Sequence, residues 1–342
     1  MPVTMDAKKL IHNDKTTGGT VTIRASKTNL NPSQGGKSGT ITLRGRIAYV
    51  KSNSAIKEKE ARLEERNRLI EAAETKAASP GMSGTEEGAK LHAAADRLKE
   101  NNVAVERARL ADNVYNTDPS SAPPGWERIE DHPGDDGFHA ATYRSQIDGT
   151  EVLVFEGTTM TSLDDWAANL GQGAGLETSQ YKQAIELAKA AKITNPNIQL
   201  AGHSLGGGLA SAGASVSGAP TWTFNSAGLH PKTSARAGGN YELANQVTKS
   251  WQIAGEILGS VQTYGDLLTK GIGAYIGSKI GGPLGGVVGA ALAPGVPDAV
   301  GELTMLEPAM PGGTFDKHRM EHVIKSIEAE KTQDIATMKQ AI

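Results

Sequence analysis

The chain has 342 residues, 35 basic against 38 acidic side chains, and a net charge of −3 at pH 7. This balance provides no general positive field for nucleic acid phosphates, so we expect no nucleic-acid partner. The sequence contains no cysteine, which excludes disulfides, thiolate metal sites and cysteine nucleophiles. Residues 1–10 are charged and lack the apolar run of about 7–15 residues found in signal peptides. We therefore expect synthesis in the cytoplasm without a signal peptide and secretion by another route.

The first fifty residues, 1–50, are predicted to form a small β-rich region. Polar and β-branched residues alternate at 20–24 and 40–44, between turns that contain Gly, Pro and Ser.

Residues 51–104 are predicted to form a helical connector. Residues 55–78 are rich in Glu, Lys and Arg and end at Pro80-Gly81, and a second helical stretch runs from Ala89 to about Val114. The charges of the first helix predict a solvated face.

Residues 105–342 form the predicted main domain. Two strand-like runs, 142–147 and 151–155, flank Asp148-Gly149, a dipeptide typical of a tight hairpin turn. The elements expected beyond this hairpin are helices at 180–191 and from Leu205, and strands at 198–201, 221–224 and 247–253. Strands that alternate with helices predict an α/β sheet.

Residues 202–206 read Gly-His-Ser-Leu-Gly and match the G-x-S-x-G nucleophile elbow, with a predicted strand before it and a predicted helix after it. Gly202 and Gly206 remove the Cβ atoms where strand and helix approach each other. Ser204 is the candidate nucleophile, and the backbone N–H of Leu205 at the helix start is a candidate oxyanion donor.

A serine nucleophile needs a general base, and in this architecture the histidine follows the acid in the chain. His318 and His322 are the two histidines late enough, and we favour His318 because it lies at a predicted loop-to-helix junction. Their i, i+4 spacing also suits zinc, but no third ligand pattern accompanies the pair.

The candidate acids follow a strand-like run that ends near Ile253. Glu256 lies just beyond its carboxyl end, where functional loops of such sheets lie, and Asp266 is the alternative. A second oxyanion donor is expected after the strand 151–155, where Gly157 allows a sharp turn and Thr158 offers both a backbone N–H and a hydroxyl.

Residues 152–170 (VLVFEGTTMTSLDDWAANL) and 199–209 (QLAGHSLGGGL) together resemble class 3 lipases. Residues 254–258 and 318–320 resemble, more narrowly, the lipase domains of type VI secretion effectors. The resemblance implies an α/β-hydrolase fold with a small N-terminal β/helical appendage. It also implies that Ser204 is the nucleophile, His318 the base and Glu256 the acid, with Thr158 and Leu205 forming the oxyanion hole.

The predicted function is a phospholipase that hydrolyses carboxylic esters of membrane lipids, with no metal or organic cofactor. The resemblance further implies an antibacterial effector that acts on target-cell membranes. An immunity protein and a VgrG- or PAAR-like secretion spike or adaptor would then be its partners. Two alternatives stay open: a neutral-glyceride lipase or esterase, and a non-catalytic membrane-perturbing toxin on a hydrolase fold.

A glycine-rich apolar insertion is predicted at 268–297. Its central part, 271–294, has one charge, Lys279, and contains Pro283. We favour a lid or interfacial element over the acyl site, and a buried helical hairpin or a membrane-inserting segment are the alternatives. Deletion of 271–294 should impair hydrolysis of aggregated lipid more than hydrolysis of a soluble ester.

Overall fold

The computed structural model describes residues 22–23, 41–42, 44–157, 179–256 and 299–342. The chain divides into two compact units, Met1–Glu58 and Lys59–Ile342. The first contains a two-stranded antiparallel ladder of β1 (Thr22–Ile23) and β2 (Ile41–Thr42) and the start of helix α1 (Arg44–Ala77). The two expected strands are therefore short, and the helix begins earlier than the charged stretch predicts. The boundaries after residues 50 and 104 stay predictions.

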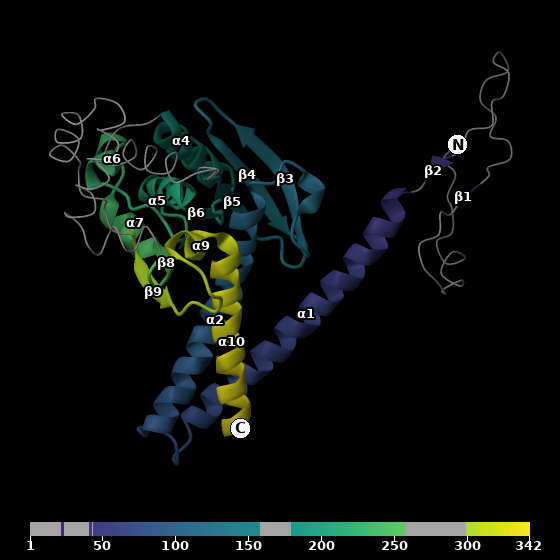
Figure 1. Cartoon of the computed structure of the whole chain (residues 1–342), viewed down its shortest axis with the longest axis vertical. Helices are drawn as coiled ribbons and strands as arrows, with labels where there is room; N and C mark the ends of the chain where they lie inside the picture. The colour runs from purple at the N-terminus through teal and green to yellow at the C-terminus, as the bar shows by residue number, and fades with distance from the viewer. Residues whose placement is uncertain (1–21, 24–40, 43, 158–178, 257–298) are drawn as a thin grey trace. The chain divides into compact units, whose positions relative to one another are not determined.

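A seven-stranded sheet forms the centre of the second unit, with its strands side by side in chain order (Figure 1). The first three strands pair antiparallel, and the pairs from β5 to β9 are parallel. The strands are β3 (Trp126–Pro133), β4 (His139–Ser145), β5 (Glu151–Phe155), β6 (Gln199–His203), β7 (Thr221–Phe224), β8 (Thr248–Ile253) and β9 (Glu302–Leu306).

Helices cover both faces of this sheet. Val152 and Val154 of β5 face a core formed with α2 (Glu86–Asn113) and α10 (Met320–Ala341). Leu153 and Phe155 face the opposite core, formed with α4 (Ser179–Thr194) and α5 (Leu205–Ser217). Because successive strand residues point to opposite faces, an unbroken apolar strand requires cover on both sides. These layers confirm the predicted α/β-hydrolase-like fold.

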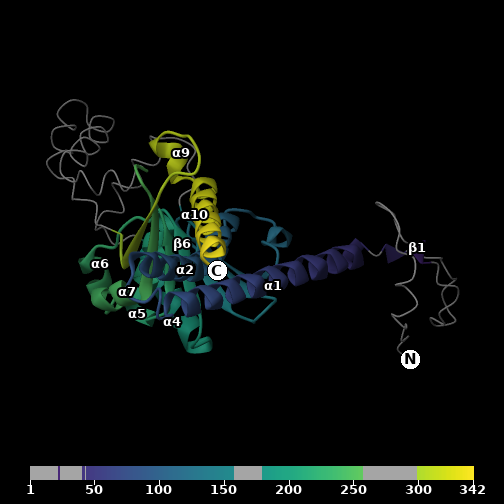
Figure 2. The same ribbon diagram turned by 90° about the horizontal axis from the view of Figure 1, so that it is seen from below.

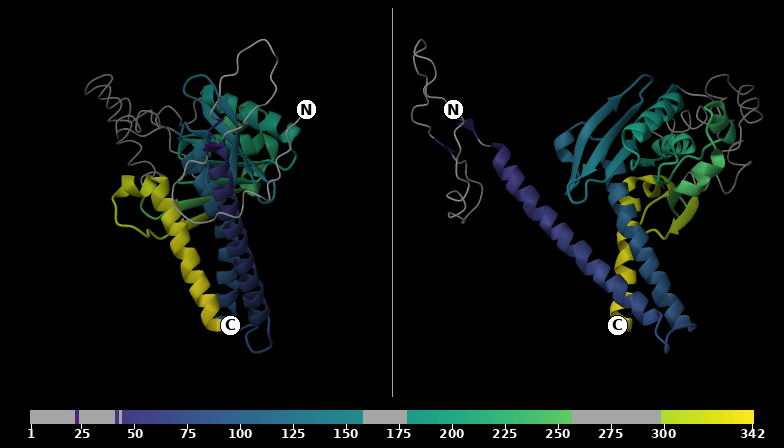
Figure 3. Two further views of the ribbon diagram at one scale, coloured as in Figure 1. Left: turned by 90° about the vertical axis from the view of Figure 1, so that its right-hand side faces the viewer. Right: turned by 180° about the vertical axis from the view of Figure 1, so that it is seen from behind.

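Helices α2 and α10 run side by side beyond the sheet, where the second half of α1 joins them (Figure 3). Their shared apolar seam includes Ile70, Leu91, Leu98 and Met338. Although the charged helix α1 is mostly exposed, as predicted, it therefore buries one narrow stripe.

A buried arginine joins α2 to the sheet. The Arg107 guanidinium lies between the rings of Trp126 and Trp222, 5.1 and 5.3 Å from their centroids, and it donates to Gln199 Oε1. Burial lowers its pKa to about 10, so this arginine remains charged at neutral pH.

The hairpin around Asp148-Gly149 is confirmed, as are the two helices and three strands that were predicted between it and Ile253. Sequence reasoning missed edge strands β3 and β9 and the short helices α6 (Pro231–Arg236) and α7 (Tyr241–Val247). Strand β3 is rich in charge, and β9 is mostly exposed, so neither has the apolar pattern of a central strand.

Candidate active site

Most of the site lies at the carboxyl ends of neighbouring parallel strands. Ser204 follows β6, Asn225 follows β7, and Glu256 lies just beyond β8. His318 ends the short helix α9 (Thr314–His318), which follows β9 and precedes α10 (Figure 2). Parallel strands place their carboxyl ends on one edge of a sheet, so residues far apart in the chain meet there.

Ser204 adopts a strained backbone conformation between β6 and α5, with φ of 56° and ψ of −127°. A Cβ atom at Gly202 would lie 2.1 Å from the Gly206 carbonyl oxygen, and one at Gly206 would lie 2.2 Å from the Phe155 carbonyl oxygen. The turn therefore has the tight strand-to-helix geometry expected of a nucleophile elbow.

Three buried side chains form a continuous hydrogen-bonded chain. His318 Nε2 lies 3.0 Å from Ser204 Oγ, and His318 Nδ1 lies 2.7 Å from Glu256 Oε2. A carboxylate only accepts hydrogen bonds, so it holds the proton on Nδ1 and leaves Nε2 free to accept from the serine. This is the geometry that a Ser-His-acid site requires.

A tight turn presents Glu256 to the histidine. The Glu256 N–H donates to the Ile253 carbonyl oxygen at 3.1 Å, and Gly255 within this turn has φ of +73°. A β-turn with positive φ at its third residue favours glycine there. The sequence Ala254-Gly255-Glu256 therefore encodes both the turn and the acid that it presents.

The two candidate bases, His318 and His322, lie in different surroundings. His322 is buried in the first turn of α10, and its Nδ1 has no hydrogen-bond partner among the described residues. His318, in contrast, contacts both Ser204 and Glu256. The alternative acid, Asp266, lies outside the described residues.

One of the two predicted oxyanion donors can be located. Leu205 is the first residue of α5, where a backbone N–H has no acceptor within its own helix. Thr158 lies outside the described residues, as does the apolar insertion 268–297. Among the helices that the structure describes, none combines the length and apolarity needed to cross a bilayer.

Sequence reasoning assigned no role to three residues around His318. The His318 carbonyl oxygen accepts from His203 Nε2 at 2.8 Å and from Asn225 Nδ2 at 3.1 Å. On the other side of its ring, His203 Nδ1 lies 3.1 Å from the Tyr115 hydroxyl. The only sequence signal is that His203 lies inside the elbow motif, since the other two residues are distant in the chain.

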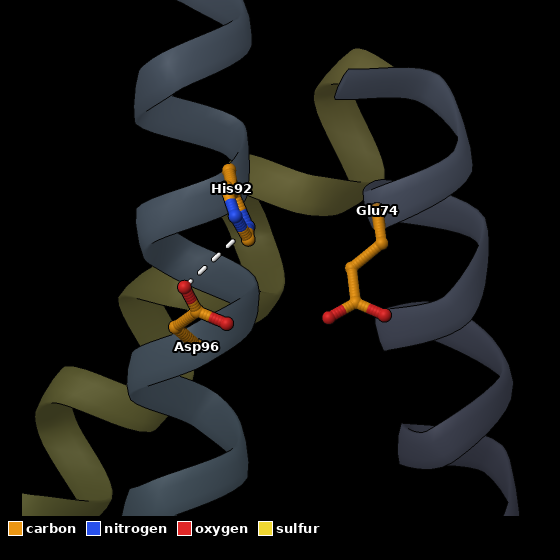
Figure 4. Close-up of side chains that lie close together, drawn as sticks. All are labelled: Glu74, His92 and Asp96. Atoms are coloured by element: carbon orange, nitrogen blue, oxygen red, sulfur yellow. Dashed lines mark ion pairs between the residues drawn. The ribbon is translucent and has the colours of Figure 1, made fainter. Parts of the chain in front are cut away.

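One surface cluster offers possible metal ligands away from this site. Glu74 of α1 and His92 and Asp96 of α2 point toward one another (Figure 4). His92 and Asp96 are exposed and form an ion pair, and Glu74 already pairs with Lys99. We assign this cluster to surface ion pairing and place no metal there.

A cavity of about 270 Å³ opens between α1, α2 and the turn after β4, with Asn67, Asn102 and Asp148 in its wall. Of the predicted site residues that the structure describes, none lines this cavity. We therefore assign it no part in the site.

Comparison with known proteins shows which proteins this chain resembles. An extracellular phospholipase A1 from Serratia liquefaciens is 34% identical over 181 residues, which cover 49% of this chain and 51% of that protein. The chain thus matches about half the length of this curated relative.

Two solved structures are similar at low identity. A fungal lipase–inhibitor complex has 16% identity and a TM-score of 0.32, and covers 45% of this chain and 71% of its own. A triacylglycerol lipase from Penicillium expansum has 13% identity and a TM-score of 0.33, with coverages of 48% and 74%.

A family model of phospholipase-like proteins, the Tle-like phospholipase domain, matches residues 106–312. The matched range is more than half of the chain, contains Ser204 and Glu256, and ends shortly before His318. The chain belongs to the Tle-like phospholipase family.

Proposed function

We propose that this protein is a serine esterase that hydrolyses carboxylic ester bonds of membrane phospholipids. The observation that carries the proposal is the buried chain of hydrogen bonds from Ser204 through His318 to Glu256. A serine hydroxyl is a weak nucleophile by itself, and it requires a base within hydrogen-bond distance. Family membership supports the choice of an ester as the substrate.

The reaction begins when Ser204 Oγ attacks the acyl carbonyl carbon and His318 Nε2 takes the serine proton. Glu256 stabilises the positive charge that forms on the imidazole. The tetrahedral intermediate collapses as its bond to the leaving alcohol breaks, and His318 returns the proton to that alcohol. Water then attacks the acyl-enzyme ester as His318 takes its proton, the bond to Ser204 Oγ breaks as His318 returns the proton to Oγ, and the fatty acid is released.

The negative oxygen of the tetrahedral intermediate needs fixed donors. The Leu205 N–H lies at the amino end of α5, where the helix dipole also favours negative charge. We propose the backbone N–H and hydroxyl of Thr158 as further donors. Each such donor supplies roughly 2.7–4 kcal/mol in comparable sites.

A phospholipid is the favoured substrate because the relative from Serratia liquefaciens is a phospholipase A1. The test supplies purified protein with phosphatidylcholine vesicles and, separately, with emulsified triacylglycerol, and measures the released fatty acid and lysolipid by mass spectrometry. We expect release from the phospholipid. Release from triacylglycerol alone would favour a neutral-glyceride lipase.

The matched variants for this test are Ser204→Ala and Ser211→Ala. Both serines are buried, but Ser211 Oγ donates only within α5, to the Gly207 carbonyl oxygen. We expect Ser204→Ala to lower kcat by on the order of 10⁶-fold and Ser211→Ala to leave it unchanged. Full activity of Ser204→Ala would refute the proposed chemistry.

We further propose that the protein is an antibacterial effector of a type VI secretion machine, with an immunity protein and a VgrG- or PAAR-like spike or adaptor as partners. The resemblance of residues 254–258 and 318–320 to such effectors supports this role. The test directs the chain to the periplasm of a Gram-negative host. Growth arrest by wild type but not by Ser204→Ala is expected. Equal arrest by both would favour a non-catalytic membrane-perturbing toxin.

A further inference from the structure

His203 is the chain neighbour of the proposed nucleophile and bonds the main chain of the proposed base. It precedes Ser204 directly in the chain, and its ring centroid lies 4.9 Å from that of His318. Its ring does not contact the serine hydroxyl through any hydrogen bond among the described residues. Both ring nitrogens are instead engaged, one with the His318 carbonyl oxygen and the other with the Tyr115 hydroxyl.

The chemistry of these partners fixes the direction of every bond. A carbonyl oxygen only accepts, so His203 Nε2 carries a proton and donates to His318. Burial, with His318 nearby, lowers the pKa of His203 to about 3, so the ring is neutral and its Nδ1 has no proton. Nδ1 therefore accepts from Tyr115. The Tyr115 hydroxyl oxygen in turn accepts from the Gly157 N–H at 3.2 Å.

The His318 carbonyl is held from a second direction as well. Asn225 Nδ2 donates to this oxygen and to the Lys317 carbonyl oxygen at 3.0 Å. The Asn225 Oδ1 accepts from the Ile253 N–H, which fixes the orientation of the amide. Asn225 is fully buried and adopts φ of +39°, a conformation that asparagine tolerates better than most residues.

Positional support of this kind matters because His318 belongs to a helix of five residues. Such a short helix has little stability of its own. The Ser204–His318 contact joins residues that are 114 positions apart, so their spacing depends on tertiary contacts. A bond from the neighbour of the nucleophile to the backbone of the base sets this spacing directly.

We propose that His203 is a positioning residue, which holds the backbone of His318 against the nucleophile elbow, and that Tyr115 orients its ring for this task. This inference rests on the proposed esterase function. In this arrangement the Gly157 N–H donates to the Tyr115 hydroxyl oxygen, so this amide does not serve as an oxyanion donor.

The test compares two amide replacements of His203 in the full chain. In His203→Gln the amide nitrogen can occupy the place of Nε2 and still donate to the His318 carbonyl. In His203→Asn the shorter side chain reaches only the place of Nδ1, so it keeps the Tyr115 contact and loses the bond to His318. Activity is measured as kcat and KM on a soluble short-chain ester, per folded molecule as judged by circular dichroism.

We expect His203→Asn to lower kcat by about 10²-fold, the scale of an ångström-sized misplacement, with KM changed less than twofold. His203→Gln should stay within about tenfold of wild type, because it keeps the bond that positions the base and loses only the Tyr115 contact. If the two variants had equal kcat values, lowered or not, the positioning role of His203 would be overturned. Ser204-dependent activity of the wild type would still support the esterase function in that case. If wild type itself had no Ser204-dependent activity, the proposed function would fail instead.

A second comparison keeps the proposal testable if His203→Asn does not fold. Tyr115→Phe removes only the hydroxyl that orients His203. Its control is Tyr143→Phe, at a buried tyrosine away from the triad whose hydroxyl donates to Asn113 at 3.0 Å. We expect Tyr115→Phe to lower kcat by about tenfold at constant KM and Tyr143→Phe to leave kcat unchanged. Equal kcat values for these two variants would overturn the role of Tyr115.

Discussion

The buried, neutral ring of His203 makes the stability of this protein sensitive to mild acid. Its pKa is lowered to about 3 by burial and, secondarily, by the nearby His318, whereas a histidine in an unfolded chain has a pKa of about 6.5. Between these two values the unfolded state binds a proton that the folded state does not. The stabilising contribution is therefore fully present above pH 6.5 and is lost as the pH falls toward 3.

The size of this effect follows from the two pKa values. Each pH unit between them changes the free energy of unfolding by about 1.4 kcal/mol, so a shift from pH 7 to pH 5 should remove about 2 kcal/mol. The His203→Gln variant cannot bind this proton. We therefore expect its free energy of unfolding to fall by about 2 kcal/mol less than that of wild type over the same interval.

Urea unfolding of wild type and His203→Gln at pH 7 and pH 5 measures this difference. Other titrating groups contribute equally to both proteins and cancel in the comparison. Ser211→Ala is the matched control, since it replaces a buried side chain that does not titrate, and it should retain the wild-type pH response. If His203→Gln lost as much stability between pH 7 and pH 5 as wild type, the neutral state of the buried ring would be refuted.

Three further substitutions address the triad, the elbow and the core. Glu256→Gln should keep the fold but lower kcat on a soluble ester by roughly 10⁴-fold, because it no longer stabilises the imidazolium, and near-normal turnover would exclude Glu256 as the acid. Gly206→Ala places a Cβ 2.2 Å from the last carbonyl oxygen of β5, so we expect a loss of roughly 1–3 kcal/mol in urea unfolding together with a loss of activity. The Gly81→Ala control, where a Cβ has open space, should match wild type. Arg107→Lys should lower the free energy of unfolding by about 1–2 kcal/mol, because lysine cannot reproduce a planar group between two indole rings, and the exposed Arg68→Lys should have no effect.

The sequence predicts best those parts of the site that depend on adjacent residues. The elbow at 202–206 and the Asp148-Gly149 hairpin need only a short run of residues with the right backbone preferences. The expected order of serine, acid and histidine along the chain left two of the eight histidines as candidate bases. The structure places one of them, His318, within hydrogen-bond distance of Ser204. Proximity to the end of a strand likewise pointed to Glu256, which the structure places beside His318.

Edge strands were missed because the physical signal for a strand weakens at the rim of a sheet. Buried and exposed residues do not alternate along β9, because Leu303 and Met305 are exposed and only Leu306, at its end, is buried. Strand β3 carries charged side chains on half of its residues and contains a register shift between Arg128 and Glu130. Neither strand therefore has the continuous buried apolar run of the central strands, although each forms a full ladder with its neighbour.

The environment of His203 could not be predicted for a different reason, since its partners, Tyr115 shortly after α2 and His318 at the end of α9, are distant in the chain. Desolvation keeps the ring neutral, and neutrality gives it one donor and one acceptor, as the Tyr115 and His318 contacts require. A protonated His203 would present a second donor to Tyr115 and a positive charge beside His318, the proposed base, which accepts a proton in the proposed mechanism. The burial that makes the fold sensitive to acid is therefore the same property that would let His203 support the proposed base without placing a second positive charge beside it.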